Sequence, residues 1–296
     1  MAEDVGPRHQ NRPVGSFIDD EGVVIETVEW PVEAPRAVIQ LSHGIGEHAR
    51  RYEALAADLN RAGFTVVADD HRGHGGTGMR QWGDPAKLGR LGPGGLRATV
   101  AAIGRFRDLT RERFPDVPLV LVAHSWGSLM AQIALNDRPD AYDGMVLTGT
   151  AYRFPGFMDA GDLNRRHRTL GTTGAEWLSR DPAVAQAWVD DPLTFPAQTT
   201  KLLGLRDALR LLGRPARSLP SDLPLLLQVG SDDTLGGGRS VERLASAYRR
   251  RSGLRDVTVR IYEGARHEVF NETNRDEVIA DTVAWIESHV LKEAHA

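Results

Sequence analysis

The chain has 296 residues with 36 lysines and arginines, 40 aspartates and glutamates, and a formal net charge of −4 at pH 7. With this charge and no basic cluster large enough to hold nucleic acid, we expect no nucleic-acid partner. The absence of cysteine excludes disulfides, a thiolate nucleophile and zinc sites built on sulfur.

The N-terminal sequence and the hydropathy of the chain bear on where the protein acts. Residues 1–13 are polar and acidic, without the apolar stretch of a secretory signal. No run approaches the ~18 consecutive apolar residues of a transmembrane helix. We therefore expect a cytoplasmic protein in solution, whose contact with lipid is at most a transient one at a membrane surface. The sequence does not predict its oligomeric state.

Strand and helix patterns alternate along most of the chain. The expected strands are residues 23–29, 37–42, 65–68, 119–123, 144–149, 225–229 and 257–262. The expected helices are residues 51–62, 94–114, 128–136, 240–251 and 275–291. Such alternation is typical of an α/β fold with a mostly parallel, doubly wound sheet flanked by helices, with ligands at the carboxyl ends of the strands.

Residues 151–220 interrupt this alternation. They contain helical patches near Leu163 and Trp177 and over residues 183–189 and 199–212, but no strong strand. A chain of this length accommodates one catalytic domain with an insertion. We predict an α/β core from residues 1–150 and 221–296, and a helical insertion from residues 151–220.

A glycine-rich segment with the sequence HGIGEH follows the expected strand 37–42. Its glycines at 44 and 46 allow the backbone to come close to a substrate oxygen. The alternative is a plain turn without a ligand.

A cluster of acidic residues and histidines follows the expected strand 65–68. Asp69, Asp70, His71 and His74 form a pattern that a metal ion could use, and the alternative is a hydrogen-bonded structural loop. The glycine-rich run 73–78 suggests a phosphate cradle, but no lysine follows and the Walker spacing is missing.

Ser125 follows the expected strand 119–123 in the sequence AHSWGS. A nucleophile elbow needs small residues two positions before and after the serine, because the chain reverses in a strained turn. Ala123 and Gly127 occupy these positions. The alternative is an ordinary strand followed by a serine that caps a helix.

An acid and a histidine follow at the ends of two later strands. Asp232 and Asp233 come after strand 225–229, and His267 comes after strand 257–262. The order Ser, Asp, His at strand ends is that of the α/β-hydrolases. We choose Asp233 as the acid because the residue three beyond Gly230 is where it falls in this turn, with Asp232 as the alternative. Taken singly, each aspartate could cap a helix, and His267 could be a solvated loop residue.

Acyl transfer needs two backbone donors for the oxyanion. One comes from the residue after the nucleophile, here Trp126, and the other from the loop after an early strand, here Ile45. Together these residues predict acyl transfer with Ser125 as nucleophile, His267 as general base and Asp233 as the residue that orients it.

The motif HGxGEHxxRY at residues 43–52, with DHRGHG at residues 70–75, resembles the monoacylglycerol lipase and lysophospholipase group of α/β-hydrolases, which is also grouped with serine aminopeptidase-like hydrolases. The resemblance extends from about residue 20 to 290 and is weakest between 150 and 220. It implies an α/β-hydrolase fold with residues 151–220 as a lid, the triad and oxyanion residues above, and the loop at 69–74 as structure. It implies no metal and no cofactor, and hydrolysis of a small-molecule ester, most readily a monoacylglycerol or lysophospholipid.

The chain departs from this group beside the nucleophile, because the group usually has GHSMGG where this chain has AHSWGS. Trp126 places a large ring there, so we expect a pocket that is narrower or better suited to flat substrates. The insertion offers Phe154, Phe157, Trp177 and Trp188 as lining residues, although packing of the insertion onto the core is the preferred alternative. The same triad could also cleave aryl esters, thioesters or amides, and a non-catalytic ligand-binding protein is the other alternative.

Overall fold

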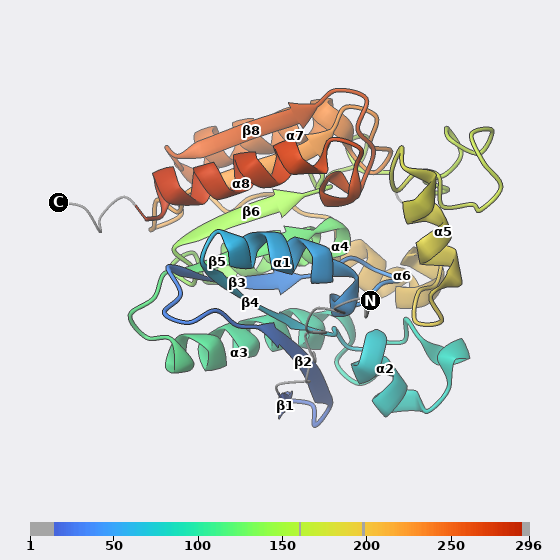
Figure 1. Ribbon diagram of the computed structural model, residues 1–296, viewed down its shortest axis with the longest axis horizontal. Helices are drawn as coiled ribbons and strands as arrows, with labels where there is room; N and C mark the ends of the chain where they lie inside the picture. The colour runs from blue at the N-terminus through green and yellow to red at the C-terminus, as the bar shows by residue number, and fades with distance from the viewer. Residues whose placement is uncertain (1–14, 160, 197–198, 292–296) are drawn as a thin grey trace, which may run out of the picture.

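An eight-stranded sheet runs through the centre of the protein (Figure 1). The computed structural model describes residues 15–159, 161–196 and 199–291. The strands follow one another in the order β1-β2-β4-β3-β5-β6-β7-β8. Their bounds are β1 Gly15–Ile18, β2 Val24–Trp30, β3 Ala37–Ser42, β4 Phe64–Asp69, β5 Leu119–His124, β6 Gly144–Thr148, β7 Leu225–Gly230 and β8 Val257–Tyr262. The pairs from β4 to β8 are parallel, and β2 pairs antiparallel with both β1 and β4.

Helices cover both faces of this sheet. Their bounds are α1 Glu53–Arg61, α2 Gly75–Trp82, α3 Gly95–Arg113, α4 Ser125–Asp137, α5 Pro182–Asp190, α6 Thr199–Arg210, α7 Gly237–Ala247 and α8 Arg275–His289, with short helical turns at Ala49–Tyr52, Pro85–Lys87, Tyr248–Ser252 and Val269–Asn271. Apolar residues of α1 and α8 form a core with one face of the sheet, and those of α3, α4 and α7 form a core with the other face. The fold is therefore the mostly parallel, doubly wound α/β-hydrolase sheet that the sequence predicts.

The central strands are apolar at nearly every position because both of their faces are buried. In β3, Val38 packs under α3 while its neighbour Ile39 packs under α1, and both are fully buried. Burial of one such side chain contributes about 1.5–3 kcal/mol. The strand ends that carry the candidate residues are thus held by a rigid core.

Two elements differ from the sequence-based expectation. The edge strand β1 is not predicted, because it is short and Phe17 is its one buried apolar side chain. The glycine-rich run at 73–78 contributes to helix α2 rather than to a loop. Gly75 has φ +49, and a Cβ there would lie 2.2 Å from Asp70 Oδ2. The glycine therefore lets α2 begin directly against this carboxylate, which accepts the Gly76 amide at 2.7 Å.

The segment 151–220 contains α5 and α6 and no strand among its described residues. The patches near Leu163 and Trp177 are turns rather than helices, which corrects the expectation there. Gly204 breaks α6 with φ 75 and ψ 164. Figure 1 shows α5 and α6 beyond the ends to which the strand arrows point, the edge where ligands are expected. Within the part of the chain that the structure describes, no helix is long and apolar enough to cross a membrane.

Candidate active site

Ser125 lies at the sharp turn between β5 and α4. Its φ of 51° falls in the left-handed region, which few residues other than glycine adopt. A side chain at Gly127 would lie 2.4 Å from the Ser42 carbonyl oxygen, so the turn needs a residue without a Cβ there. Such strain persists when the surrounding core enforces it, and it is found at nucleophile elbows.

The structure places Asp233 beside His267. His267 Nδ1 lies 3.0 Å from Asp233 Oδ1, which also accepts the Leu235 amide at 2.8 Å. Asp232 instead pairs with Arg166, with 2.7 Å between Oδ1 and Nη2, and its side chain is 36 % exposed. Of the two aspartates, Asp233 is therefore the one that orients the His267 ring.

The opposite nitrogen of this ring, His267 Nε2, is buried and has no hydrogen-bond partner among the described residues. Ser125 lies next to His124, whose ring centroid is 4.7 Å from that of His267. No hydrogen bond between Ser125 Oγ and His267 is present among the described residues; such contacts often tighten only when substrate is bound.

Burial and charge act in opposite directions on His267. Burial disfavours the imidazolium, but the Asp233 carboxylate with its hydrogen bond, together with the charges of Glu268 and Glu47, raises the pKa of His267 above its ordinary 6.5. Burial and the neighbouring His267 lower the pKa of His124 to about 3. At neutral pH His124 therefore stays uncharged, and its ring packs against that of His267.

The loop that holds Ile45 lies against Ser125. A Cβ at Gly44 would be 3.1 Å from Ser125 Cβ and 2.6 Å from Glu47 Oε1. Glu47 Oε1 accepts the Gly44 amide at 2.5 Å, which holds the turn before Ile45. Trp126 is the second residue of α4, where a backbone amide has no carbonyl one turn earlier in the helix. Ile45, Ser125 and Trp126 line the same cavity.

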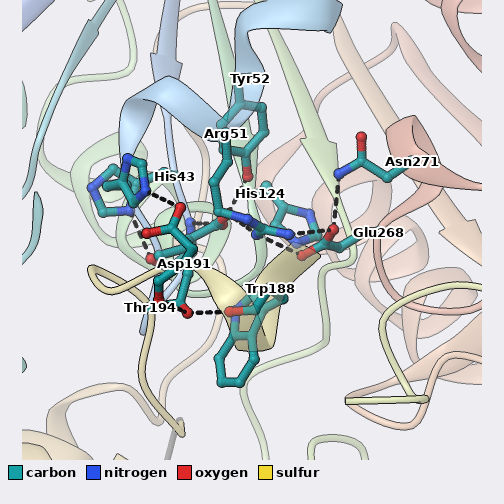
Figure 2. Close-up of polar contacts among 12 residues, drawn as sticks. His43, Arg51, Tyr52, His124, Trp188, Asp191, Thr194, Glu268 and Asn271 are labelled. Carbon is teal, nitrogen blue, oxygen red and sulfur yellow. Dashed lines mark hydrogen bonds and ion pairs between the residues drawn. The ribbon is translucent and has the colours of Figure 1, made fainter. Parts of the chain in front are cut away.

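A buried network of charges joins this loop to the histidine loop. Arg51 Nη1 contacts Glu47 Oε2 at 2.6 Å and Glu268 Oε1 at 2.8 Å, and its Nη2 contacts Glu268 Oε2 at 3.1 Å. Tyr52 donates its hydroxyl to Glu47, and Asn271 donates its amide to Glu268. Figure 2 shows Glu268 held between Arg51 and Asn271.

Arg51 determines the ionisation of this network. Burial opposes ionisation of Glu268, but the Arg51 guanidinium lowers its pKa to about 2. For Glu47 burial outweighs the lowering effect of the same guanidinium, and its pKa is raised. Burial also opposes the charge on Arg51, yet the carboxylates of Glu268 and Glu47 raise its pKa above the ordinary value. Removing Arg51 would leave two carboxylates together in a dry site.

We expect Arg51→Met to destabilise the fold by about 3–5 kcal/mol at neutral pH, because breaking a buried ion pair leaves uncompensated charge. Urea denaturation measures this. Pairing with Arg51 depresses the pKa of Glu268, so this stabilisation is present above the ordinary carboxyl pKa of 4.5 and is lost below it. The deficit of the variant should therefore shrink in acid.

The matched control is Arg36→Met, which removes an ion pair with Glu287 whose side chains are 50 % and 42 % exposed. It should cost less than about 1 kcal/mol. Equal small losses in both variants would contradict a supporting role for Arg51.

The acidic and histidine cluster that follows β4 is a hydrogen-bonded support for these loops. His71 contacts Asp69 Oδ2 through Nδ1 at 2.8 Å and Ser42 Oγ through Nε2 at 3.0 Å. Asp70 accepts the amides of Ala49 and Gly76. Across residues 15–159, 161–196 and 199–291, no group of three or more His, Cys, Asp or Glu side chains is arranged to hold a metal ion.

A cavity of about 200 Å³ opens at Ser125. Most of its lining is apolar and comes from α4, α6 and the segment 151–220: Ile45, Trp126, Leu129, Met158, Asp159, Gly161, Leu163, Trp177, Thr199, Leu205, Ala208, Leu209, Leu211, Leu212 and Leu235 line it with Ser125. The Trp126 ring stacks on His74 with 5.2 Å between ring centroids and is 2 % exposed. Its bulk is therefore packed largely into the protein.

The aromatic residues of the segment 151–220 take different places. Trp177 is among the residues that line the cavity. Phe154 and Phe157 instead pack on Tyr152 in the main core, which is the preferred alternative of the sequence analysis rather than the lining role. Trp188 packs with Ala175, Leu178 and Ala185 in a small cluster against which Trp177 also packs. The contact surface of the cavity thus owes more to leucines than to aromatic rings.

The loop after α5 is hydrogen-bonded to the loop that contains Ile45. His48 Nε2 lies 2.8 Å from Asp191 Oδ2. The Phe195 amide donates to the Gly46 carbonyl at 3.0 Å. Figure 2 shows Asp191 and Thr194 in this loop, near Trp188.

Sequence reasoning missed two sets of functional residues. It identified Glu47 and Arg51 as motif letters but gave them no role, although their spacing of four residues near a helix start favours an ion pair. It also missed the leucines of α6, whose helical recurrence along residues 199–212 was the available signal. No local pattern in the sequence marks Glu268 as the partner of Arg51.

Comparisons with known proteins place the chain in a family. The model of the family described as serine aminopeptidase, S33, matches residues 33–274. A monoacylglycerol lipase of Mycolicibacterium smegmatis is 32 % identical over 93 % of this chain and 97 % of its own, and a monoglyceride lipase of Mus musculus is 29 % identical over 100 % and 99 %.

Solved structures of an esterase and a lipase superpose on this chain. A thermostable carboxyl esterase from Bacillus coagulans superposes with a TM-score of 0.80 at 25 % identity, covering 93 % of this chain and 97 % of the esterase. A monoacylglycerol lipase of Paleococcus ferrophilus superposes with a TM-score of 0.66 at 25 % identity, covering 90 % and 99 %.

Proposed function

The chain belongs to the serine aminopeptidase S33 family of α/β-hydrolases, and from this premise we propose that it cleaves single-chain lipid esters through an acyl-enzyme on Ser125. It is a carboxylic ester hydrolase, as its lipase and esterase relatives are named. The observation that carries the proposal is the strained serine at the mouth of an apolar cavity, next to a buried histidine and carboxylate pair.

In the proposed reaction His267 Nε2 takes the proton of Ser125 Oγ as the oxygen attacks the ester carbonyl. The His267 imidazolium that forms is stabilised by Asp233, which accepts a hydrogen bond from its Nδ1–H. The imidazolium then protonates the leaving alcohol. Water attacks the acyl-enzyme with His267 again as base, and the acid is released.

The amides of Ile45 and Trp126 are the proposed donors to the oxyanion. One such donor typically lowers the barrier by ~2.7–4 kcal/mol. The hydrogen bond from the Gly44 amide to Glu47 supports this role, because it fixes the backbone just before Ile45. A preorganised donor costs no reorganisation when charge develops.

The cavity supports a substrate with one acyl chain. Its volume of about 200 Å³ and its leucine-rich lining suit an extended aliphatic group, whose transfer from water into the cavity is favourable. We propose that residues 151–220 act as the cap over this cavity. Leu205 and Leu209 are 67 % and 55 % exposed while they line it, which supports a transient contact of the cap with a lipid surface.

A kinetic panel tests the substrate class. We expect the highest kcat/KM on monoacylglycerols or lysophospholipids, lower values on short aryl esters, and the lowest on amides, because the long chain alone fills the apolar cavity. Ser125→Ala protein supplies the background rate. Higher kcat/KM on amides or thioesters would overturn the assignment in favour of the other reactions that this triad class performs, and binding without turnover would favour a non-catalytic ligand-binding protein.

A further inference from the structure

A short segment of the proposed cap runs along the histidine loop. We call residues 176–180 the strap. The amide of His267 donates to the Trp177 carbonyl at 3.3 Å, and the amide of Glu268 donates to the Leu178 carbonyl at 2.7 Å. The backbone at the candidate base is therefore bonded to the strap at two consecutive residues.

The partly buried Arg266 and Arg180 and the buried Glu272 hold both ends of this contact. Arg266 Nη1 donates to the carbonyls of Glu176 at 2.6 Å and Ser179 at 2.7 Å. Glu272 accepts the Arg180 amide at 3.0 Å and the Arg180 Nε at 2.8 Å. Hydrogen bonds to charged groups are stronger than those between neutral groups, so these contacts fix the strap to the loop.

Two aromatic rings pack on the imidazole of His267. The Trp177 ring lies at 4.7 Å between centroids with an interplanar angle of 36°, and the His124 ring lies at 4.7 Å with an angle of 56°. Asp233 holds Nδ1. The ring is thus constrained by three contacts, and its Nε2 is buried without a hydrogen-bond partner among the described residues.

Trp177 touches two functional parts of the site at once. Its indole packs on His267, and the same side chain lines the cavity proposed for the acyl chain. A residue that only shaped the cavity would not need the backbone bonds of the strap to the histidine loop. These bonds fix the position from which the indole contacts the imidazole.

We propose that Trp177 is a positioning residue for His267, held in place by the strap, so that part of the cap supports the catalytic base as well as covering the substrate. The inference rests on the proposed function of Ser125 and His267. Misplacement of a reacting group by about 1 Å costs ~10²-fold in rate. Loss of the indole should therefore act on kcat.

The test compares p-nitrophenyl acetate, whose acyl group leaves the cavity nearly empty, with p-nitrophenyl laurate, which extends into it. Trp177→Ala should lower kcat about 10- to 100-fold on both esters with little change of KM on the acetate. Trp177→Phe, which restores an aromatic face, should recover most of the loss. An unchanged kcat on the acetate, with a raised KM on the laurate alone, would show a lining residue and overturn the proposal.

Two further variants keep the test decisive. Trp82→Ala removes a tryptophan of α2 that neither lines the cavity nor packs in the cluster of Trp177, and it should leave kcat within a few-fold of the wild type. Arg266→Met releases the strap carbonyls and should lower kcat on both esters as Trp177→Ala does. The double variant should lose less than the product of the two effects, because both act through His267. A loss of kcat in the double variant equal to the product of the two single losses would contradict a shared action on His267.

Thermal melting shows whether each variant folds, and Trp177→Leu replaces Trp177→Ala with the same expectation if the latter does not. The wild type separates the two levels of the argument. Absence of turnover on both esters by the wild type would reject the proposed function and this inference with it. An active wild type that Trp177→Ala matches on both esters would reject the inference alone.

Discussion

Ser125→Ala is expected to lower kcat on ester substrates by about 10⁴- to 10⁶-fold, because no acyl-enzyme can form and the members of a triad act as a unit. Substrate binding should survive, since alanine removes one oxygen and leaves the apolar lining of the cavity in place. The measurement is steady-state hydrolysis of p-nitrophenyl esters, with KM or ligand affinity followed in parallel.

The matched control is Ser288→Ala, which changes an exposed serine of α8 in the same way. Its kcat should stay within a few-fold of the wild type. Full activity in Ser125→Ala would remove Ser125 from the mechanism, whatever the geometry of the turn that holds it.

The second large effect is expected for Asp233→Asn. Without the carboxylate the His267 ring loses its orienting acceptor and the stabilisation of its charged form, and kcat should fall by about 10⁴-fold. Asp232→Asn is the control, since Asp232 pairs with Arg166 and does not contact His267. It should leave kcat nearly unchanged. The reverse ranking of the two variants would assign the role to Asp232.

The pH profile gives an independent reading of the same pair. The base must be neutral, so kcat/KM rises with pH through the pKa of His267. Burial lowers this pKa, but Asp233 and, more weakly, Glu268 and Glu47 raise it, so the acidic limb of the wild type should have its midpoint above 6.5. In Asp233→Asn burial remains and the largest raising contribution is gone, while those of Glu268 and Glu47 stay. The midpoint should therefore move downward, and an unchanged midpoint would contradict the assigned pairing.

The strands and the order of the candidate residues could be predicted from the sequence because both depend on local patterns. A strand buried on both faces must be apolar at almost every position, and β3, β5 and β7 are. The turn at Ser125 needs small residues at fixed offsets, which the sequence displays directly. Parallel strands then bring their carboxyl ends to one edge of the sheet, so residues far apart in the chain meet there.

The contacts of the cap could not be predicted in the same way. Aromatic residues mark burial but not its direction, so Phe154 and Phe157 turned out to pack on the main core while Trp177 faces the cavity. The pairing of Arg51 with Glu268 spans 217 residues and depends on where two loops meet. The sequence does not predict helix α2 because glycine is a poor helix former. The close approach of Gly75 to Asp70, which requires glycine there, is visible only in the structure.

Trp126 shows how the two kinds of information combine. The sequence places a large ring beside the nucleophile and predicts a narrower pocket. The structure packs that ring on His71 and His74, with its remaining exposed edge in the cavity wall. A preference for flat substrates stays a prediction, which the aryl esters in the kinetic panel address.

Covalent labelling with a fluorophosphonate, followed by peptide mass analysis, tests the central claim most directly. An activated serine reacts with such a probe, whereas a serine that merely caps a helix does not. We predict one label per chain on Ser125 in the wild type, a much slower reaction in Asp233→Asn, and no label in Ser125→Ala. An unlabelled wild type, or a label that persists in Ser125→Ala, would contradict the account.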